Sequence, residues 1–154
     1  MARVVLLTGG NMGDRSRSLA TAREMIARRI GRVIGESAVH ESAPWGFSAD
    51  EPFLNQVLVV DTCLKPVEVL NVAQDIEKEM GRHRTAFPAE SGNRVYTSRP
   101  IDIDILFFDD LILETPRLTI PHPLIAEREF VLVPLREVLP DYIHPLLKKA
   151  IREM

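Results

Sequence analysis

Two aspartates alternate with isoleucines in the segment Ile101-Asp102-Ile103-Asp104-Ile105. In a β-strand both carboxylates would project from one face, roughly 7 Å apart along the chain. Neighbouring carboxylates repel each other unless a cation lies between them. Mg²⁺ fits such a pair because it takes one or two carboxylates and completes its shell with waters and phosphate oxygens. A strand with a solvated polar face has the same alternation, so this motif alone leaves both interpretations open.

Basic residues just before the aspartates favour the metal interpretation. Between residues 82 and 99, five basic side chains stand against one acid, Glu90: Arg82, His83, Arg84, Arg94 and Arg99. Magnesium together with several guanidinium groups is typical of phosphoryl transfer, where positioning and charge neutralisation provide most of the catalysis. The chain has no P-loop motif, so a nucleotide would be held by another device. A solvated basic loop is the alternative interpretation.

Phe53 and Asn55 fall on one face of an apolar segment, residues 53–62, that is typical of a strand. An aromatic ring beside a carboxamide suits a flat heterocycle, through stacking and paired hydrogen bonds to the ring edge. A core phenylalanine beside a structural asparagine has the same spacing. The spacing therefore leaves a heterocycle site and a plain core open.

One of the four histidines has neighbours that suggest a role. His122 stands between two prolines, and Arg117 and Arg128 lie within a few residues of it. His40 and His144 have no such partners in the sequence and receive no role.

The elements that must position these side chains follow the order β-α-β-β-α-β. Strands are expected at residues 3–8, 33–42, 53–62 and 101–108. Helices are expected from Asp14 to Gly31 and from Pro66 to Gly81, where a cap, a proline and two glycines mark the ends. This order predicts an α+β, ferredoxin-like antiparallel sheet with both helices on one face. A C-terminal extension, with a hairpin at 111–120 and one or two late helices, would cover the other face and make α/β/α layers.

Composition excludes several classes of protein. The 154 residues, 45% hydrophobic and 27% charged, fit one globular domain spanning 1–154. No apolar run approaches the ~20 residues of a membrane helix, and a net charge of −3 gives no support for nucleic-acid binding. A single cysteine, Cys63, excludes an internal disulfide. We therefore expect a cytoplasmic protein. A monomer is the expected state, although no feature of the sequence determines it. The unpatterned stretch 82–100 predicts a functional lid or a flexible segment.

Motifs spread over residues 3 to about 145 resemble one enzyme family. They are Gly9-Gly10-Asn11-Met12-Gly13-Asp14, Pro44-Trp45-Gly46, Phe53-Leu54-Asn55, Glu77 through Arg84, Arg99 to Leu106, Arg117 to His122, and Arg128 with Phe130. The family is 6-hydroxymethyl-7,8-dihydropterin pyrophosphokinase, of folate biosynthesis. Each motif is weak alone, but their combination is specific. The chain departs from the family pattern with Gly10 for serine, Pro100 for threonine, and Tyr96 near the position of a familiar tryptophan.

The resemblance implies that ATP donates pyrophosphate to the hydroxymethyl oxygen of the pterin and that AMP is released. Asp102 and Asp104 would bind two Mg²⁺ ions, and with Arg82 and Arg99 they would be the catalytic residues. The implied ATP site comprises Gln74, Glu77, Arg82, Arg84, Tyr96, Arg99, Ile105, Arg117, Leu118, Thr119, His122 and Arg128. The implied pterin site comprises Ser42, Ala43, Pro44, Trp45, Phe53, Asn55 and Phe130. Residues 83–98 would form a lid that excludes water.

Two other functions compete with this interpretation. A DxD-type metal-dependent phosphohydrolase would need an activated water and a base, and no second acidic cluster is evident near the aspartates. A ferredoxin-like ligand-sensing module would leave the arginines and the paired aspartates without a role.

Overall fold

The computed structural model describes residues 1–10, 14–42, 53–81 and 101–154. Its elements run in this order: β1 (Ala2–Gly10), α1 (Arg15–Arg29), β2 (Gly31–Glu36), β3 (His40–Ser42), β4 (Phe53–Thr62), α2 (Pro66–Glu79), β5 (Asp102–Phe108), β6 (Leu113–Glu114), β7 (Thr119–Ile120), η1 (Ile125–Glu127), α4 (Glu129–Val138) and η2 (Ile151–Glu153). The predicted β-α-β-β-α-β order and the later hairpin are confirmed.

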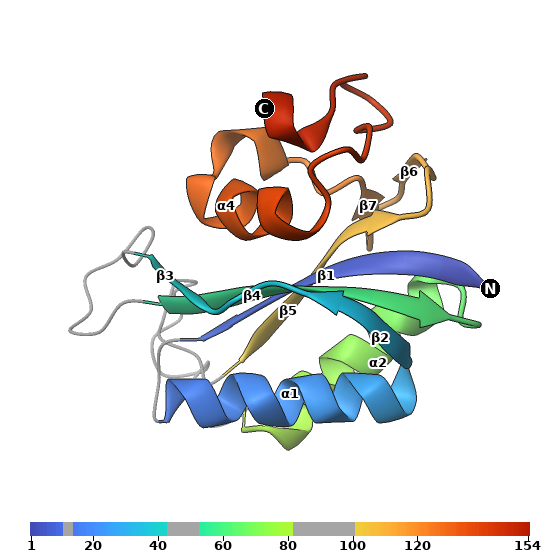
Figure 1. Cartoon of the computed structure of the whole chain (residues 1–154). Helices are drawn as coiled ribbons and strands as arrows, with labels where there is room; N and C mark the ends of the chain where they lie inside the picture. Colours follow the sequence, from blue (N-terminus) through green and yellow to red (C-terminus); the bar gives the residue numbers. More distant parts are fainter. Residues whose placement is uncertain (11–13, 43–52, 82–100) are drawn as a thin grey trace, which may run out of the picture.

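The central sheet is antiparallel, with the strand order β2-β4-β1-β5, and β3 also pairs with β4. The first and third main strands of the chain therefore lie in the middle, and β5 lies at an edge. Figure 1 shows the sheet between two helical layers, α1 and α2 below it and α4 above it. This arrangement confirms the predicted α+β, ferredoxin-like fold with α/β/α layers.

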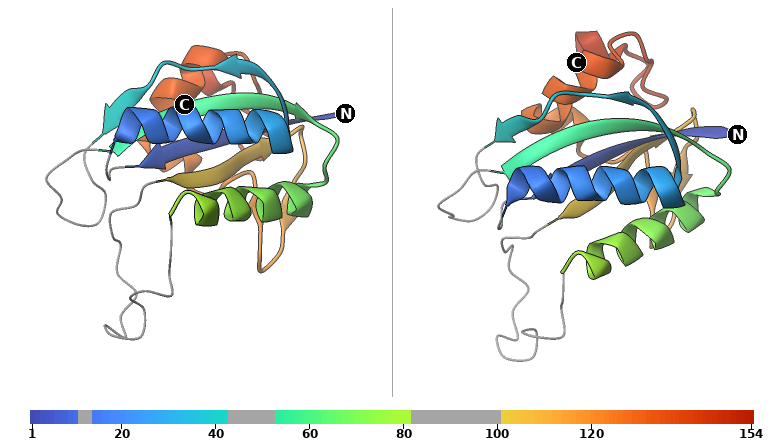
Figure 2. Two further views of the ribbon diagram at one scale, coloured as in Figure 1. Left: turned by 90° about the horizontal axis from the view of Figure 1, so that it is seen from below. Right: turned by 60° about the horizontal axis from the view of Figure 1, so that its bottom comes forward.

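α1 and α2 cover one face of the sheet (Figure 2), and the side chains buried between them and the sheet are apolar. α1 begins where the Asp14 carboxylate accepts a hydrogen bond from the Arg17 backbone N–H at 3.1 Å, a side-chain cap of the first turn. Helical spacing then gives α1 one apolar stripe against the sheet. Its buried members, with those of α2 and the sheet, include Leu19, Ala22, Ile26, Val69, Ala73, Ile76, Leu6, Leu58, Ile103 and Ile105.

The opposite face is packed by α4 and the C-terminal segment. The buried side chains of this second core are Val5, Leu7, Val57, Leu106, Phe107, Ile125, Val131, Leu132, Leu135 and Ile151. Pairing between β1 and β5 shifts by one residue beside Leu106, so Leu106 and Phe107 both belong to this face. The C-terminal extension therefore covers the second face, as predicted.

The predicted strand at residues 33–42 is wrong in one respect, because it is interrupted. Glu36 pairs with Leu58 whereas His40 pairs with Asn55, so residues 37–39 lie opposite only two residues of β4. An extra residue of this kind is accommodated as a bulge that bends the strand. Strand periodicity in one segment carries no information about such a mismatch with its partner.

Gly31 and the first strand also differ from prediction. α1 ends at Arg29, and Gly31 begins β2, where an added Cβ would lie 1.9 Å from the Asp61 carbonyl oxygen. β1 continues to Gly10, two residues past its predicted end. No helix among the described residues is long and apolar enough to span a membrane. The predicted lid at 83–98 and the loop at 43–52 lie outside the described residues.

Candidate active site

A row of three residues crosses the sheet near the end of β1. Gly9 of β1 pairs with Asn55 of β4 on one side and with Asp102 of β5 on the other. Directly paired residues of antiparallel strands point to the same face, so Asn55 and Asp102 share a face across Gly9. The sheet register thus brings together residues that are 47 positions apart in the chain, as 102 − 55.

The next row places the second aspartate on the same face. Leu7 pairs with both Val57 and Asp104, and Leu7 and Val57 belong to the core beneath α4. Asp102 and Asp104 are half-buried. The isoleucines between and beside them are at most 5% exposed and belong to the core on the α1 and α2 face. Both carboxylates therefore lie on the α4 face, which is the geometry that the Ile-Asp alternation predicts.

Gly9 is required by the site, although sequence analysis treated it only as part of a turn. A Cβ at Gly9 would stand 2.6 Å from the Asn55 Oδ1 and 3.2 Å from the Leu54 carbonyl oxygen. Asn55 is only 4% exposed, so its carboxamide has little room to retreat. The absence of a side chain lets the carboxamide approach β1. The available signal was a glycine pair directly after an apolar strand.

The donor set suits magnesium. Among the described residues no group of three or more His, Cys, Asp or Glu side chains could hold a metal ion. A site with two carboxylates alone is poor for zinc, which prefers nitrogen and sulfur ligands in a closed shell. It matches Mg²⁺, which keeps waters and takes substrate phosphate oxygens. Asp102 and Asp104 therefore fit the predicted ion.

Glu77 fixes the strand that carries the aspartates. Its carboxylate, only 5% exposed, accepts a hydrogen bond of 2.7 Å from the backbone N–H of Ile103, midway between Asp102 and Asp104. Because β5 is an edge strand, this N–H points away from β1 and would otherwise be unpaired in a buried place. A hydrogen bond from an N–H to a charged acceptor is strong, so Glu77 holds β5 against α2.

Other predicted ATP residues gather along the outer side of β5. Arg117, which precedes β7, donates from Nη2 to Asn71 Oδ1 at 2.8 Å and to Gln74 Oε1 at 3.4 Å, both on α2. Leu118 and Ile105 are buried in the core between the sheet and α2. α2 and β7 both contact β5, and Thr119 lies in β7. The structure therefore brings these residues together at one sheet edge.

The hydrogen bonds of His122 leave its ring able to donate a hydrogen bond from Nε2 while uncharged. Its backbone N–H donates to the Leu106 carbonyl at 3.0 Å, and its Nδ1 accepts from the Leu124 N–H at 3.2 Å. The neutral ring then carries its proton on Nε2. Burial lowers the pKa of His122 and the nearby Arg128 charge lowers it further, while the Asp102 carboxylate acts in the opposite direction.

Arg128 and Phe130 stand at the start of α4. The Arg128 guanidinium carbon lies 5.5 Å from the Phe130 ring centroid, within cation–π range. Arg128 is the N-cap residue of α4, a position where the helix dipole disfavours a cation.

Several predicted site residues cannot be located. Arg82, Arg84, Tyr96, Arg99, Ala43, Pro44 and Trp45 lie outside the described residues. Ser42 is described only by its backbone, which pairs with Phe53. The structure thus gathers along β5 the predicted residues of α2, β7 and the His122 turn. It sets Asn55 across β1 from Asp102 and places Arg128 near His122.

Fold and site together define an α+β protein whose ferredoxin-like sheet carries paired carboxylates beside basic groups, suited to metal-dependent phosphoryl transfer. Residues 5–140 match the model of a family described as 7,8-dihydro-6-hydroxymethylpterin-pyrophosphokinase (HPPK). The chain belongs to this family.

Two relatives carry the name 2-amino-4-hydroxy-6-hydroxymethyldihydropteridine pyrophosphokinase. The Porphyromonas gingivalis protein is 42% identical over 146 residues, which are 94% of this chain and 95% of the relative. The Aquifex aeolicus protein is 38% identical over 153 residues, 99% of this chain and 90% of the relative. The predicted family and pyrophosphokinase function are confirmed, and the phosphohydrolase alternative finds no support.

A solved structure of Plasmodium falciparum HPPK-DHPS with pteroate has a similar fold. The TM-score is 0.76 at 18% identity, and the match covers 98% of this chain. This chain spans only 41% of that longer one, and at such low identity the likeness concerns the fold alone.

Proposed function

We propose that this chain transfers pyrophosphate from ATP to the hydroxymethyl oxygen of 6-hydroxymethyl-7,8-dihydropterin over the row formed by Asn55, Gly9 and Asp102. The observation that supports this assignment is the register, which sets the Asn55 carboxamide and the Asp102 carboxylate on one face, on either side of Gly9. Transfer of the β- and γ-phosphates with release of AMP requires attack of the pterin oxygen on the β-phosphorus. The acceptor and the metal-bound phosphates must therefore lie side by side.

Asp102 and Asp104 would hold two Mg²⁺ ions, which neutralise the triphosphate charge that builds up during transfer. Enzymes of this family are ATP-dependent and generally use Mg²⁺; the number of ions is part of the proposal. The contribution of the protein is to keep both carboxylates on one rigid strand, with Glu77 holding the strand from its outer edge.

ATP would wrap around the edge strand β5. The base and ribose would lie along the outer side, near Gln74, Ile105 and Arg117, because that edge still carries outward backbone groups. By strand alternation, Ile105 N–H points to the same edge as Ile103 N–H. The phosphates would reach the α4 face and meet His122 and Arg128.

His122 and Arg128 would contact phosphate in different ways. The depressed pKa of His122 keeps the ring neutral near pH 7, so Nε2–H donates a hydrogen bond without adding charge. The Arg128 guanidinium supplies charge and a planar fork that matches phosphate oxygens. Leu118 and Thr119 would line the same site from the hairpin.

The pterin would bind between Phe53 and Phe130, with its ring edge hydrogen-bonded to Asn55. An amide offers both a donor and an acceptor to such an edge. The roles of residues 42–45, of the catalytic arginines Arg82 and Arg99, and of the lid at 83–98 stay predictions. A single domain over residues 1–154, a monomeric state and a cytoplasmic location likewise stay predictions.

The test is to incubate the protein with ATP, MgCl₂ and the hydroxymethyl-dihydropterin, and to quantify AMP, ADP and phosphate. We expect AMP release that depends on both the pterin and the metal. Release of ADP or phosphate that is independent of pterin would contradict the proposal. Asn55→Ala should raise KM for the pterin while KM for ATP stays unchanged. This variant therefore tests where the pterin binds, whereas the product assay tests which reaction occurs.

A further inference from the structure

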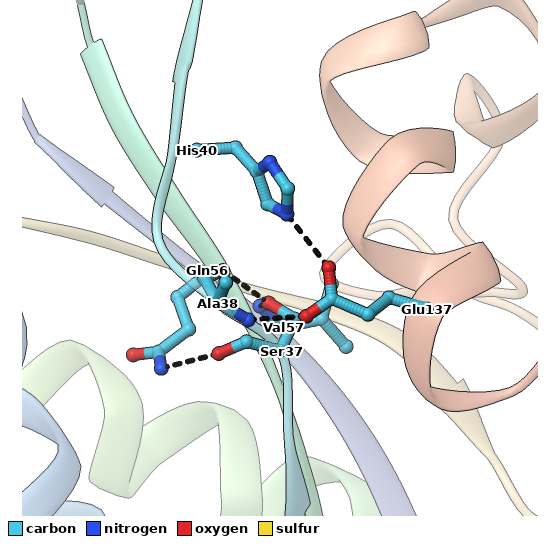
Figure 3. A network of polar contacts seen from close by, with 6 residues as sticks. All are labelled: Ser37, Ala38, His40, Gln56, Val57 and Glu137. Carbon is cyan, nitrogen blue, oxygen red and sulfur yellow. Dashed lines mark hydrogen bonds and ion pairs between the residues drawn. The ribbon is translucent and has the colours of Figure 1, made fainter.

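The last turn of α4 holds the bend between β2 and β3 from above the sheet (Figure 3). One carboxylate oxygen of Glu137 accepts the backbone N–H of Ala38 at 2.5 Å. The other oxygen lies 2.9 Å from Nε2 of His40. A single side chain of α4 thus contacts both the bend and the first residue of β3. We call Glu137, Ala38 and His40 the α4 clamp.

The same bend is tied to β4 from the other side. The Ser37 hydroxyl accepts the Val57 N–H at 3.0 Å and donates to the Ala38 carbonyl at 2.7 Å. Gln56 Nε2 donates to the Ser37 carbonyl at 2.8 Å. These bonds satisfy the backbone of a bend whose extra residue removes it from the regular ladder.

The clamp acts on the strand beside the proposed pterin site. β3 has three residues, of which His40 pairs with Asn55 and Ser42 with Phe53. His40 therefore extends the row of Asn55, Gly9 and Asp102 to a fourth strand. A slip of β3 by one residue would turn its side chains to the opposite face and displace the chain that leads into residue 43.

α4 also connects the clamp to the other wall of that site. The helix begins beside Arg128 and Phe130 and reaches Glu137 in its last turn. Its buried face packs on Val57 of β4. The helix that presents Phe130 is therefore anchored, through Glu137, to the strand that borders Phe53 and Asn55.

The clamp is too exposed to be explained by stability. The His40 and Glu137 side chains are 32% and 39% exposed, and at such exposure even a fully charged pair contributes roughly 0–1 kcal/mol. The Ala38 N–H, followed by His40, lowers the pKa of Glu137, so the carboxylate is ionised at neutral pH. The bonds are directional, however, and they define where β3 lies.

We propose that Glu137 and His40 are positioning residues for the acceptor substrate, a flat pterin heterocycle, and that they act by fixing β3 and α4 around Phe53, Asn55 and Phe130. The inference rests on the proposed pterin assignment of Phe53 and Asn55. Neither residue touches the reacting atoms in this scheme. Their loss changes the affinity for the pterin and leaves the affinity for the nucleotide as it is.

The experiment measures dissociation constants for the pterin, with a non-hydrolysable ATP analogue and Mg²⁺ bound, and for the analogue alone. Glu137→Ala should weaken pterin binding about tenfold, since small misplacements of a binding group carry large penalties. Affinity for the ATP analogue should stay within about twofold. Glu137→Gln should recover most of the pterin affinity, because its amide oxygen still accepts the Ala38 N–H.

Two controls make the outcomes distinct. Glu79 of α2 forms a comparable surface pair with Arg29 of α1, at 2.5 and 2.7 Å, on the sheet face opposite to α4 (Figure 1). Glu79→Ala should therefore match Glu137→Ala in thermal stability and bind pterin normally. Asn55→Ala reports on the pterin assignment itself. If Asn55→Ala binds pterin normally, the assignment of the site is wrong.

The proposed positioning role of Glu137 is contradicted if Asn55→Ala weakens pterin binding while Glu137→Ala does not. It is equally wrong if Glu137→Ala weakens both ligands to the same extent, or if Glu137→Gln fails to recover affinity. His40→Leu keeps the Ala38–Glu137 hydrogen bond, so this variant tests the proposal if Glu137→Ala does not fold. It should weaken pterin binding by a smaller factor, and unchanged affinity in that variant would overturn the role of His40.

Discussion

Two turns of this protein share the sequence His-Pro-Leu and the same internal hydrogen bond. In each, the leucine N–H donates to the histidine Nδ1 at 3.2 Å, in residues 122–124 and in residues 144–146. His122 lies near Arg128 and Asp102. His144 is 4% exposed and meets the Phe107 ring edge-on at 5.4 Å. One local motif thus lies at the proposed phosphate site in one place and in a core in the other.

The contrast extends to the two ends of β5 on the α4 face. At its start, Asp102 and Asp104 are half-buried, and Asp102 lies near His122. At its end, the C-terminal segment closes over the strand, with the Tyr142 ring 4.7 Å from the Phe107 ring and the Tyr142 hydroxyl donating to the Asp109 carbonyl. The Asp109 carboxylate accepts the Arg3 N–H at 2.8 Å. The printed hydrogen bonds at this end join groups of the protein to one another and tie the C-terminal segment and β1 to the end of β5.

The largest expected effect is a difference in turnover between variants of the aspartates at the start of β5 and a variant of Asp109, just after its end. Asp102→Asn and Asp104→Asn should each lower turnover by roughly a thousandfold, because a metal ligand for the transferred phosphates is lost. Asp109→Asn keeps a hydrogen-bond acceptor and tolerates the positive φ of 52° at that residue. AMP release should stay normal in this third variant. Near-normal turnover of either site variant would remove that aspartate from the mechanism.

The two histidines should give opposite outcomes. His144→Ala removes the acceptor of two backbone N–H groups and an aromatic contact, so it should lower the free energy of unfolding by about 2 kcal/mol. His122→Ala should lower kcat/KM for ATP about tenfold or more, through loss of one donor to phosphate. Urea unfolding and steady-state kinetics of both variants measure the difference. Equal activity losses would abolish the distinction.

Gly9→Ala should affect the site end alone. Its methyl group would meet Asn55 Oδ1 and the Leu54 carbonyl, so we expect KM for the pterin to rise about tenfold and stability to fall by about 1–3 kcal/mol. Gly35→Ala is the matched control, since its nearest contact is an ordinary 3.5 Å to Val59. An unchanged KM in Gly9→Ala would mean that the carboxamide can move away at little cost.

The smallest effect concerns pH. Burial lowers the pKa of His144 below its ordinary value of 6.5, and burial followed by Arg128 lowers the pKa of His122. Below pH 6.5 the unfolded chain therefore binds protons that the folded chain does not, and stability falls as pH decreases. His144→Asn retains an acceptor that does not titrate. Its melting temperature should decline less than that of the parent between pH 7 and pH 5. A parallel decline would show that His144 does not contribute.

Much of this site was predictable because its signals are local. The Ile-Asp alternation placed both carboxylates on one face once residues 102–108 formed a strand, and the spacing of Phe53 and Asn55 did the same for β4. The Asp14 cap and Pro66 marked the helix starts. The motif set also identified the family and therefore the reaction.

Only the tertiary structure decided which of these faces meet. Strand order and register place Asn55 and Asp102 on either side of Gly9, and pairing is specified by packing between distant segments. Glu77 accepts the Ile103 N–H, which points outward from the sheet because β5 is its edge strand. The sequence alone does not show that β5 lies at the edge. Glu137 contacts His40 although the two residues are 97 positions apart in the chain. His122 and His144 have the same local sequence, and the groups that the fold brings around each ring put only His122 beside Arg128 and Asp102, at the proposed phosphate site.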